Sequence, residues 1–249
     1  MSISLKHIRN QGFPVNNAPH DREMTLLEHL AELRHRLIIA GAATILGMVI
    51  AALFLTWPVV QLLAEPYGAK LVALGPTETF VIYFKVALVI GAALAMPVIV
   101  SQIILFVLPA LHPDERRYLF IGVPSITVAF CIGLAFGYFV VVPSAVRFLS
   151  SFGAGTIQSQ WTLEKYFDFV SSLLFWIGVS FETPLLLFFL AKIGVVSAKQ
   201  LGRYRRFALV GAFVMGAAIT PTPDPFNQTL VSIPIYLLYE LGVLLARFA

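Results

Sequence analysis

Six apolar runs limit what this chain can fold into more than any other feature of its sequence. They cover residues 37–57, 81–108, 118–142, 166–190, 207–220 and about 230–245. A helix rises about 1.5 Å per residue, so roughly 20 apolar residues cross the hydrocarbon core of a bilayer, which is about 30 Å thick. The first four runs reach that length. The pattern therefore predicts an all-α, polytopic membrane protein with six transmembrane helices.

The last two runs are shorter than the others. Residues 207–220 would rise only about 21 Å as a helix, which leaves two alternatives open. The two runs form either short spans in locally thinned lipid or a re-entrant hairpin around the prolines at 221–225. Other prolines lie within or at the ends of most runs, where they bend helices: Pro97, Pro124, Pro143, Pro184 and Pro234. We expect these bends and the two short members to give a concave, cupped bundle.

The composition excludes several classes of protein. Of the 249 residues, 59% are apolar and only 12% are charged, so much of the surface must face lipid. This excludes an ordinary cytoplasmic enzyme, a disordered protein and a nucleic-acid module. The single Cys131 excludes a disulfide framework and a cysteine metal site. The sequence also lacks the G-x-x-x-x-G-K-[ST], H-E-x-x-H and G-x-S-x-G motifs, so we expect no enzymatic activity, metal or cofactor.

The distribution of positive charge predicts the topology. We divide the chain into a polar cytoplasmic tail at residues 1–23 and one membrane domain at residues 24–249. Thirteen of the 17 Lys and Arg residues lie in the first 36 residues, in the loops after the second and fourth runs, and at the C-terminus. Positive loops stay on the cytoplasmic side, so both termini should be cytoplasmic. Because the first apolar run has the length of a span, we expect no cleaved signal peptide.

An amphipathic helix is expected at residues 24–36, just before the first run. Thr25 and Glu28 match a capping box. Leucines at positions 26, 30, 33 and 37 form an apolar stripe, which leaves Glu32 and Arg36 on the polar, water-facing side. Taken alone, this segment favours an interfacial anchor. The alternative is that Glu32 and Arg34 face a ligand.

Glu182 lies inside the fourth run, about 15 Å along the helix from Lys192. A carboxylate at that depth is costly unless it is paired, protonated or turned toward a watery cavity. We expect a functional polar contact, and a structural hydrogen bond to a neighbouring helix is the alternative. Three other acidic residues have simpler explanations: Glu240 can reach the interface or serve a structural role, Asp224 suits a tight turn, and Glu115 lies in a solvated loop.

Five stretches of the sequence are similar to one known family. They are residues 29–37 (HLAELRHRL), 106–117 (FVLPALHPDERR), 178–184 (GVSFETP), 218–224 (AITPTPD) and 233–242 (IPIYLLYELG). Together they extend from about residue 24 to residue 248, in order, on six spans with both termini inside. The chain resembles the TatC family, the receptor subunits of the twin-arginine protein translocase.

The resemblance implies a cupped, six-helix protein of the bacterial or archaeal cytoplasmic membrane that binds signal peptides with paired arginines. It also implies single-span partners of the TatA and TatB type, further copies of the chain in the complex, and transport of folded proteins by the proton-motive force. The competing hypothesis is a proton-coupled small-molecule transporter in which Glu182 carries the proton. In that case Gln102 and Ser101 would be the only obvious polar side chains near Glu182 within the membrane.

The resemblance also implies which residues take part. The signal peptide would contact residues on the cytoplasmic face, namely Glu32, Arg34, Phe106 and Glu115. Two carboxylates there can each accept a guanidinium group. Intramembrane polar contacts would come from Glu182 and Gln102. Pro66 and Asp224 are similar to positions that the family uses on the outer side.

Overall fold

The structure is a computed structural model that describes residues 26–68, 71–107, 116–152, 160–220 and 224–249. Within these ranges the secondary structure is helical, apart from one isolated β-bridge between Val72 and Thr162. The all-α prediction is therefore confirmed. The expected tail at residues 1–23 lies outside the described residues.

The first helical rod is longer than the first apolar run. It joins four consecutive elements: α1 (Leu26–Ile50), the π-helix η1 (Ala51–Leu55), α2 (Thr56–Ala64) and the 3-10 helix η2 (Glu65–Tyr67). From Leu26 onward, the expected amphipathic helix and the first span are thus one continuous helix.

The other apolar runs each form one helix or one broken rod. The second run forms α3 (Glu78–Val107). The third run forms α4 (Arg116–Phe136), the π-helix η4 (Gly137–Val141) and α5 (Val142–Ser151), and the fourth forms α6 (Leu163–Phe181) and α7 (Thr183–Lys192). After the short α8 (Ala198–Arg203), the last two runs form α9 (Arg205–Ile219) and α10 (Pro225–Leu245).

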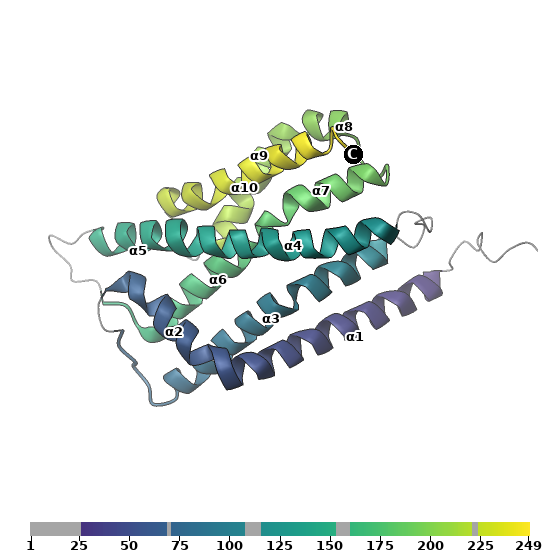
Figure 1. Cartoon of the computed structure of the whole chain (residues 1–249). Coiled ribbons are helices and arrows are strands. Elements are labelled where there is room, and N and C mark those ends of the chain that lie inside the picture. The colour runs from purple at the N-terminus through teal and green to yellow at the C-terminus, as the bar shows by residue number, and fades with distance from the viewer. Residues whose placement is uncertain (1–25, 69–70, 108–115, 153–159, 221–223) are drawn as a thin grey trace, which may run out of the picture.

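The helices form two outer pairs with two further rods between them (Figure 1). α1 and α3 lie side by side along one edge, and α9 and α10 pack together at the opposite edge. The rods α4–α5 and α6–α7 lie between them. The start of α1, the end of α3 and the C-terminus share one end of the bundle, which we call the proximal end; α2 and the start of α6 lie at the opposite, distal end.

Helix length separates α9 from the other membrane helices. Within the described residues, five helical segments are long and apolar enough to cross a membrane, and α10 is among them. The 15 residues of α9 would rise only about 22 Å. α10 begins five residues before the expected start at 230, and its 21 residues rise about 31 Å. α9 and α10 are the two shortest spans, as expected, but only α9 is too short for a flat bilayer.

The early start of α10 has a local cause. The Asp224 side chain accepts a hydrogen bond from the backbone N–H of Asn227 at 2.7 Å, which is the geometry of a helix N-cap. Pro225 then occupies the first helical position, where its missing N–H costs nothing. The sequence pattern predicts a turn at Asp224, and the structure shows that the residue also caps α10.

Two spans contain π-helical turns. In η1 the backbone N–H of Thr56 donates to the carbonyl of Ala51, and in η4 the N–H of Val142 donates to the carbonyl of Gly137. Both bonds reach back five residues instead of four, so each turn contains one extra residue. The prolines act differently from one another. Pro143 and Pro184 lie in the first turn of α5 and α7, where a new helix begins, whereas α3, α4 and α10 continue through their internal prolines.

α6 is the centre of the buried core. Its side chains Tyr166, Phe167, Val170 and Leu173 are almost completely buried, and the helix contacts α3, α4 and α10. Lipid tails are as apolar as these side chains, so close packing rather than water exclusion holds the helices together.

The seam between α1 and α3 depends on two glycines. A Cβ built on Gly47 would lie 2.5 Å from the carbonyl oxygen of Gly91, and a Cβ on Gly91 would lie 2.3 Å from the backbone nitrogen of Met48. Both distances are far below a normal van der Waals contact, and the atoms met are backbone atoms that cannot rotate away. The two helices therefore touch backbone to backbone at this point, as small residues allow in membrane helices.

We expect Gly91→Ala to destabilise the protein, because the added methyl group must push α1 away from α3. Overpacking of this kind costs about 1–3 kcal/mol. The matched control is Gly41→Ala in α1, the other helix of this pair, where an added Cβ meets nothing within 4 Å; it should be neutral or slightly stabilising. Thermal unfolding of the purified variants in detergent measures the difference, and equal melting temperatures would contradict the backbone contact.

Candidate functional site

A polar and aromatic cluster joins α1 to α3 at the proximal end. We call it the α1–α3 cluster, and it consists of His29, Glu32, Arg36, Gln102 and Phe106. Arg36 Nη2 pairs with Glu32 Oε1 at 3.1 Å, and Arg36 Nη1 donates to Gln102 Oε1 at 3.2 Å. The rings of His29 and Phe106 stack, with their centroids 4.5 Å apart and an angle of 22° between their planes. The guanidinium of Arg36 therefore holds the Glu32 carboxylate in one position against α3.

The Glu32 carboxylate keeps one oxygen unused. Its side chain is 20% exposed, and Oε2 is buried without a hydrogen-bond partner among the described residues. A buried acceptor without a donor is unfavourable, since it has lost its water and gained nothing in return. The arrangement leaves a pre-oriented anionic acceptor next to an aromatic pair.

The structure places the predicted signal-peptide residues differently from one another. Glu32 and Phe106 belong to the α1–α3 cluster. Arg34 is exposed on the surface of α1. Glu115 lies outside the described residues. Gln102, which the sequence analysis grouped with Glu182, contacts Arg36 in the cluster.

Sequence reasoning missed the roles of His29 and Arg36. Positions 29, 32 and 36 are spaced by three and four residues, so they lie on one face of a helix, and this spacing was a usable signal. Arg36 was assigned to a water-facing side, but it packs against α3 instead, while Leu30 and Leu37 of the leucine stripe are exposed. The reason is the solvent: in lipid, leucines can face outward and polar groups find partners on a neighbouring helix.

Glu182 lies at the break between α6 and α7. Its side chain is only 7% exposed, and both carboxylate oxygens are buried without a hydrogen-bond partner in the described part of the chain. Its backbone carbonyl accepts from the N–H of Leu186 at 2.9 Å, which continues the helix past Pro184. The structural hydrogen bond considered as an alternative is thus not made to any described residue. An unpaired acid in this position is typical of a site that receives a proton or a polar partner.

Pro66 belongs to a cap at the distal end. It lies half-buried in η2, next to Tyr67. The hydroxyl oxygen of Tyr67 accepts from the N–H of Trp161 at 3.2 Å, and the hydroxyl of Tyr166 donates to the carbonyl of Leu63 at 2.6 Å. The end of the first rod is thereby attached to the start of α6.

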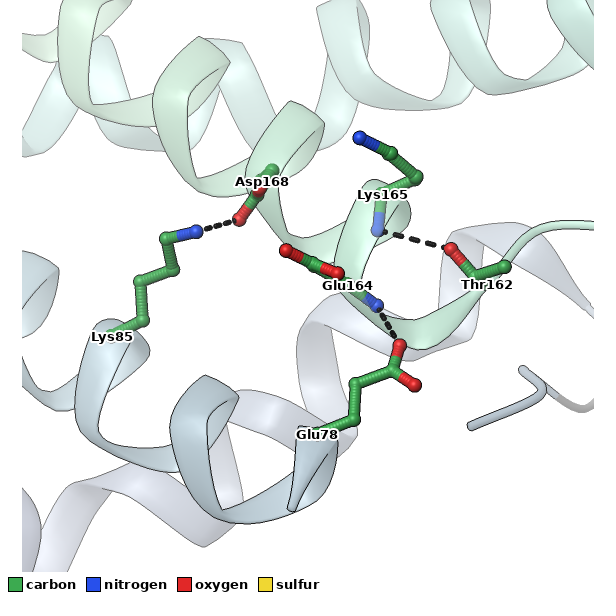
Figure 2. Close-up of polar contacts among 6 residues, drawn as sticks. All are labelled: Glu78, Lys85, Thr162, Glu164, Lys165 and Asp168. Atoms are coloured by element: carbon green, nitrogen blue, oxygen red, sulfur yellow. Dashed lines mark hydrogen bonds and ion pairs between the residues drawn. The ribbon is translucent and has the colours of Figure 1, made fainter. Parts of the chain in front are cut away.

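Glu78, at the start of α3, completes this cap. Its Oε1 accepts from the backbone N–H of Glu164 at 2.7 Å, as Figure 2 shows, and its Oε2 accepts from the N–H of Leu74 at 2.6 Å. A second contact lies two turns further along α3 and one turn further along α6. There Lys85 of α3 pairs with Asp168 of α6 at 2.5 Å (Figure 2). One carboxylate and one ion pair thus join α3 to α6.

Comparison with known proteins places the chain in a family. The family model described as Sec-independent protein translocase protein (TatC) matches residues 28–234. A Sec-independent protein translocase protein TatC from Carboxydothermus hydrogenoformans is 37% identical over 92% of this chain and 95% of its own length. The protein of the same name from Synechocystis sp. is 39% identical over 92% and 90%, respectively. A chloroplastic relative from Arabidopsis thaliana is 38% identical over 92% of this chain and 68% of its own length.

A solved structure supports the same placement. The crystal structure of a twin-arginine translocase receptor, TatC, superimposes with a TM-score of 0.78 at 37% identity, over 89% of this chain and 99% of that one. The agreement in sequence and in fold covers nearly the whole described membrane domain. The chain therefore belongs to the TatC family of Sec-independent protein translocase proteins.

Proposed function

We propose that this protein is the receptor subunit of a twin-arginine translocase, which binds twin-arginine signal peptides and helps to move folded proteins across the membrane using the proton-motive force. The observation that carries the proposal is Oε2 of Glu32, which has no hydrogen-bond partner among the described residues, while Oε1 pairs with Arg36, which in turn donates to Gln102. A solved relative is named a twin-arginine translocase receptor. The competing small-molecule transporter hypothesis gains no support from family membership.

The chemistry of the α1–α3 cluster suits an arginine ligand. A guanidinium group presents several N–H donors in one plane, and a carboxylate accepts them in a short, charge-assisted bond. Glu32 already accepts one such group from Arg36, and its second oxygen has no partner among the described residues, so in this proposal it accepts a second guanidinium. In this proposal Glu115 supplies the second carboxylate, Phe106 supports the apolar part of the signal, and the exposed Arg34 donates to its backbone carbonyls.

Glu182 is assigned a second role in the same process. A polar group from a partner helix, or from a signal inserted beside α6 and α7, would provide the hydrogen bond that the described residues do not. Pro66 and Asp224 are assigned to the outer side. On that side Pro66 lies in η2, which is part of the cap at the distal end, and Asp224 is the N-cap of α10.

Single-span partners of the TatA and TatB type would dock on α9 and α10. A shallow, open groove of about 430 Å³ lies there, lined by Leu209, Val210, Phe213, Val214, Ala217 and Gln228. Val210 and Val214 are exposed, and α9 alone is too short to fill the bilayer. A neighbouring transmembrane helix can pack into such a groove. Further copies of the chain would complete the complex, in the cytoplasmic membrane of a bacterium or archaeon with both termini inside.

The acidic acceptor can be tested with peptides. Glu32→Ala should weaken the binding of a signal peptide with Arg-Arg by about 10- to 100-fold, the loss expected for a hydrogen bond to a charged group. A Lys-Lys peptide, which cannot form the planar fork, should bind more weakly from the start and lose less. Glu28→Ala, one turn earlier on α1, is the matched charge control. Equal losses for both peptides in a calorimetric titration would leave only general electrostatics.

The orientation can be tested by labelling. In a Cys131→Ser background, a cysteine replacing Phe248 or Val195 should react with a membrane-impermeant maleimide only from the cytoplasmic side. A cysteine replacing Leu74 should react only from outside. All three positions are exposed, so access is decided by the membrane and not by burial. A reversed pattern would overturn the positive-inside assignment.

Two substitutions separate the possible roles of Glu182. Glu182→Gln keeps the size and hydrogen bonding of the side chain without its ionisation, whereas Glu182→Ala removes both. If Glu182 is a hydrogen-bonding contact, Gln should retain most transport and Ala should lose most of it. Transport of a folded precursor into membrane vesicles, at matched protein levels, gives the readout. Loss in both variants would instead indicate that Glu182 must carry a proton.

A further inference from the structure

We propose that the proximal ends of α9 and α10 form a binding site for the headgroup of an anionic phospholipid. A cavity of about 310 Å³ lies there, lined by Arg205, Glu240, Leu241, Leu244 and Arg247. Its size is at the lower end of the range for small-molecule sites in proteins. Basic pockets between membrane helices are suited to acidic lipid headgroups.

The cavity has a defined polar wall. Arg205 Nη2 of α9 pairs with Glu240 Oε2 of α10 at 2.8 Å, and the Tyr236 hydroxyl donates to Glu240 Oε1 at 2.8 Å. Each carboxylate oxygen is therefore engaged, which supports the structural interpretation of Glu240. The pair holds Arg205 in place at the cavity and cancels one charge. Arg247 then gives the lining a net positive charge of one.

Further positive charge lies close to Arg205 in the sequence. Arg203 ends α8, Arg206 follows Arg205 in the first turn of α9, and both are exposed. Glu240 is the acidic member of the lining, and it is already paired. A phosphate at this position would meet a lining with a net positive charge.

The apolar part of the lining favours a lipid over a soluble phosphate. Leu241 and Leu244 follow Glu240 on α10, between it and Arg247, and both are exposed, so the lining also offers an apolar surface to an acyl chain. Tyr204 and Phe207 are exposed beside the start of α9, with ring centroids 6.0 Å apart. Aromatic residues of this kind mark the level of the headgroups. The arginines thus lie where lipid phosphates are found.

A lipid at this site would have a structural consequence for α9. This helix is too short to reach both faces of a flat bilayer. A headgroup bound by Arg205 and Arg247 would tie the proximal end of α9 to the end of α10 and to one leaflet. Under the proposed orientation this is the cytoplasmic leaflet.

The test uses the purified full chain in detergent with phosphatidylglycerol and, as the neutral counterpart with the same acyl chains, phosphatidylethanolamine. Native mass spectrometry counts the bound lipids at increasing lipid concentration. Phosphatidylglycerol should bind more tightly than phosphatidylethanolamine, and Arg247→Gln should weaken its binding roughly fivefold, as expected for one arginine near a charged headgroup. Arg247→Gln leaves the Arg205–Glu240 pair intact.

The matched control is Arg203→Gln, which removes the same charge from a nearby exposed position outside the cavity lining. It should weaken phosphatidylglycerol binding much less than Arg247→Gln does, because Arg203 does not line the cavity. Equal binding of the two lipids, or equal losses in the two variants, would overturn the proposal and leave a general attraction of opposite charges. Glycerol phosphate is added as a soluble competitor. If it displaces phosphatidylglycerol when the two are present at equal concentrations, the site takes a soluble phosphate rather than a lipid.

Discussion

A polar side chain inside a bilayer has no water to bind, so it must find its partner within the protein, and this constraint orders the helices. Three helix pairs are joined by contacts that involve charged groups: Arg36 with Gln102 across α1 and α3, Lys85 with Asp168 across α3 and α6, where Glu78 adds a second contact, and Arg205 with Glu240 across α9 and α10. Apolar packing alone is nearly indifferent to which faces of two helices meet in lipid. The charged contacts select one face on each helix and so define the register of the bundle.

The apolar runs were enough to locate the membrane helices, because the length of a span follows directly from the thickness of the bilayer. Charge pairing was harder to predict, since partners such as Lys85 and Asp168 are 83 positions apart and nothing local links them. The start of α10 could have been predicted from the sequence, because an Asp followed by Pro is a good helix beginning. It was missed because the same residues also suit a tight turn. The π-helical turns had no signal that hydropathy can detect.

In the candidate site, too, some residues could be predicted from the sequence and others could not. Glu32 and Phe106 were identified through the family resemblance, and the structure brings both into one cluster. His29 and Arg36 were overlooked because a water-facing helix was assumed, which inverts the faces of a helix that in fact lies against α3. Glu182 was selected on physical grounds alone, from its depth in an apolar run. Both its carboxylate oxygens are without a partner in the described part of the chain, which agrees with that reasoning, and its role in transport stays a prediction.

The π-helical turn η1 also affects how spans of this kind can vary in length. In a regular α-helix one inserted residue rotates everything after it by about 100°, whereas the wider π-helical turn absorbs the extra residue and leaves the flanking helices in place. The faces that α1 and α2 bury are therefore kept, and Ala51–Leu55 takes up the extra residue. Deleting one residue there would give a regular helix and would leave Leu63 in the core. Single-residue insertions and deletions among related chains are accordingly expected to fall within 51–55 and 137–141 rather than in the straight helices that flank them.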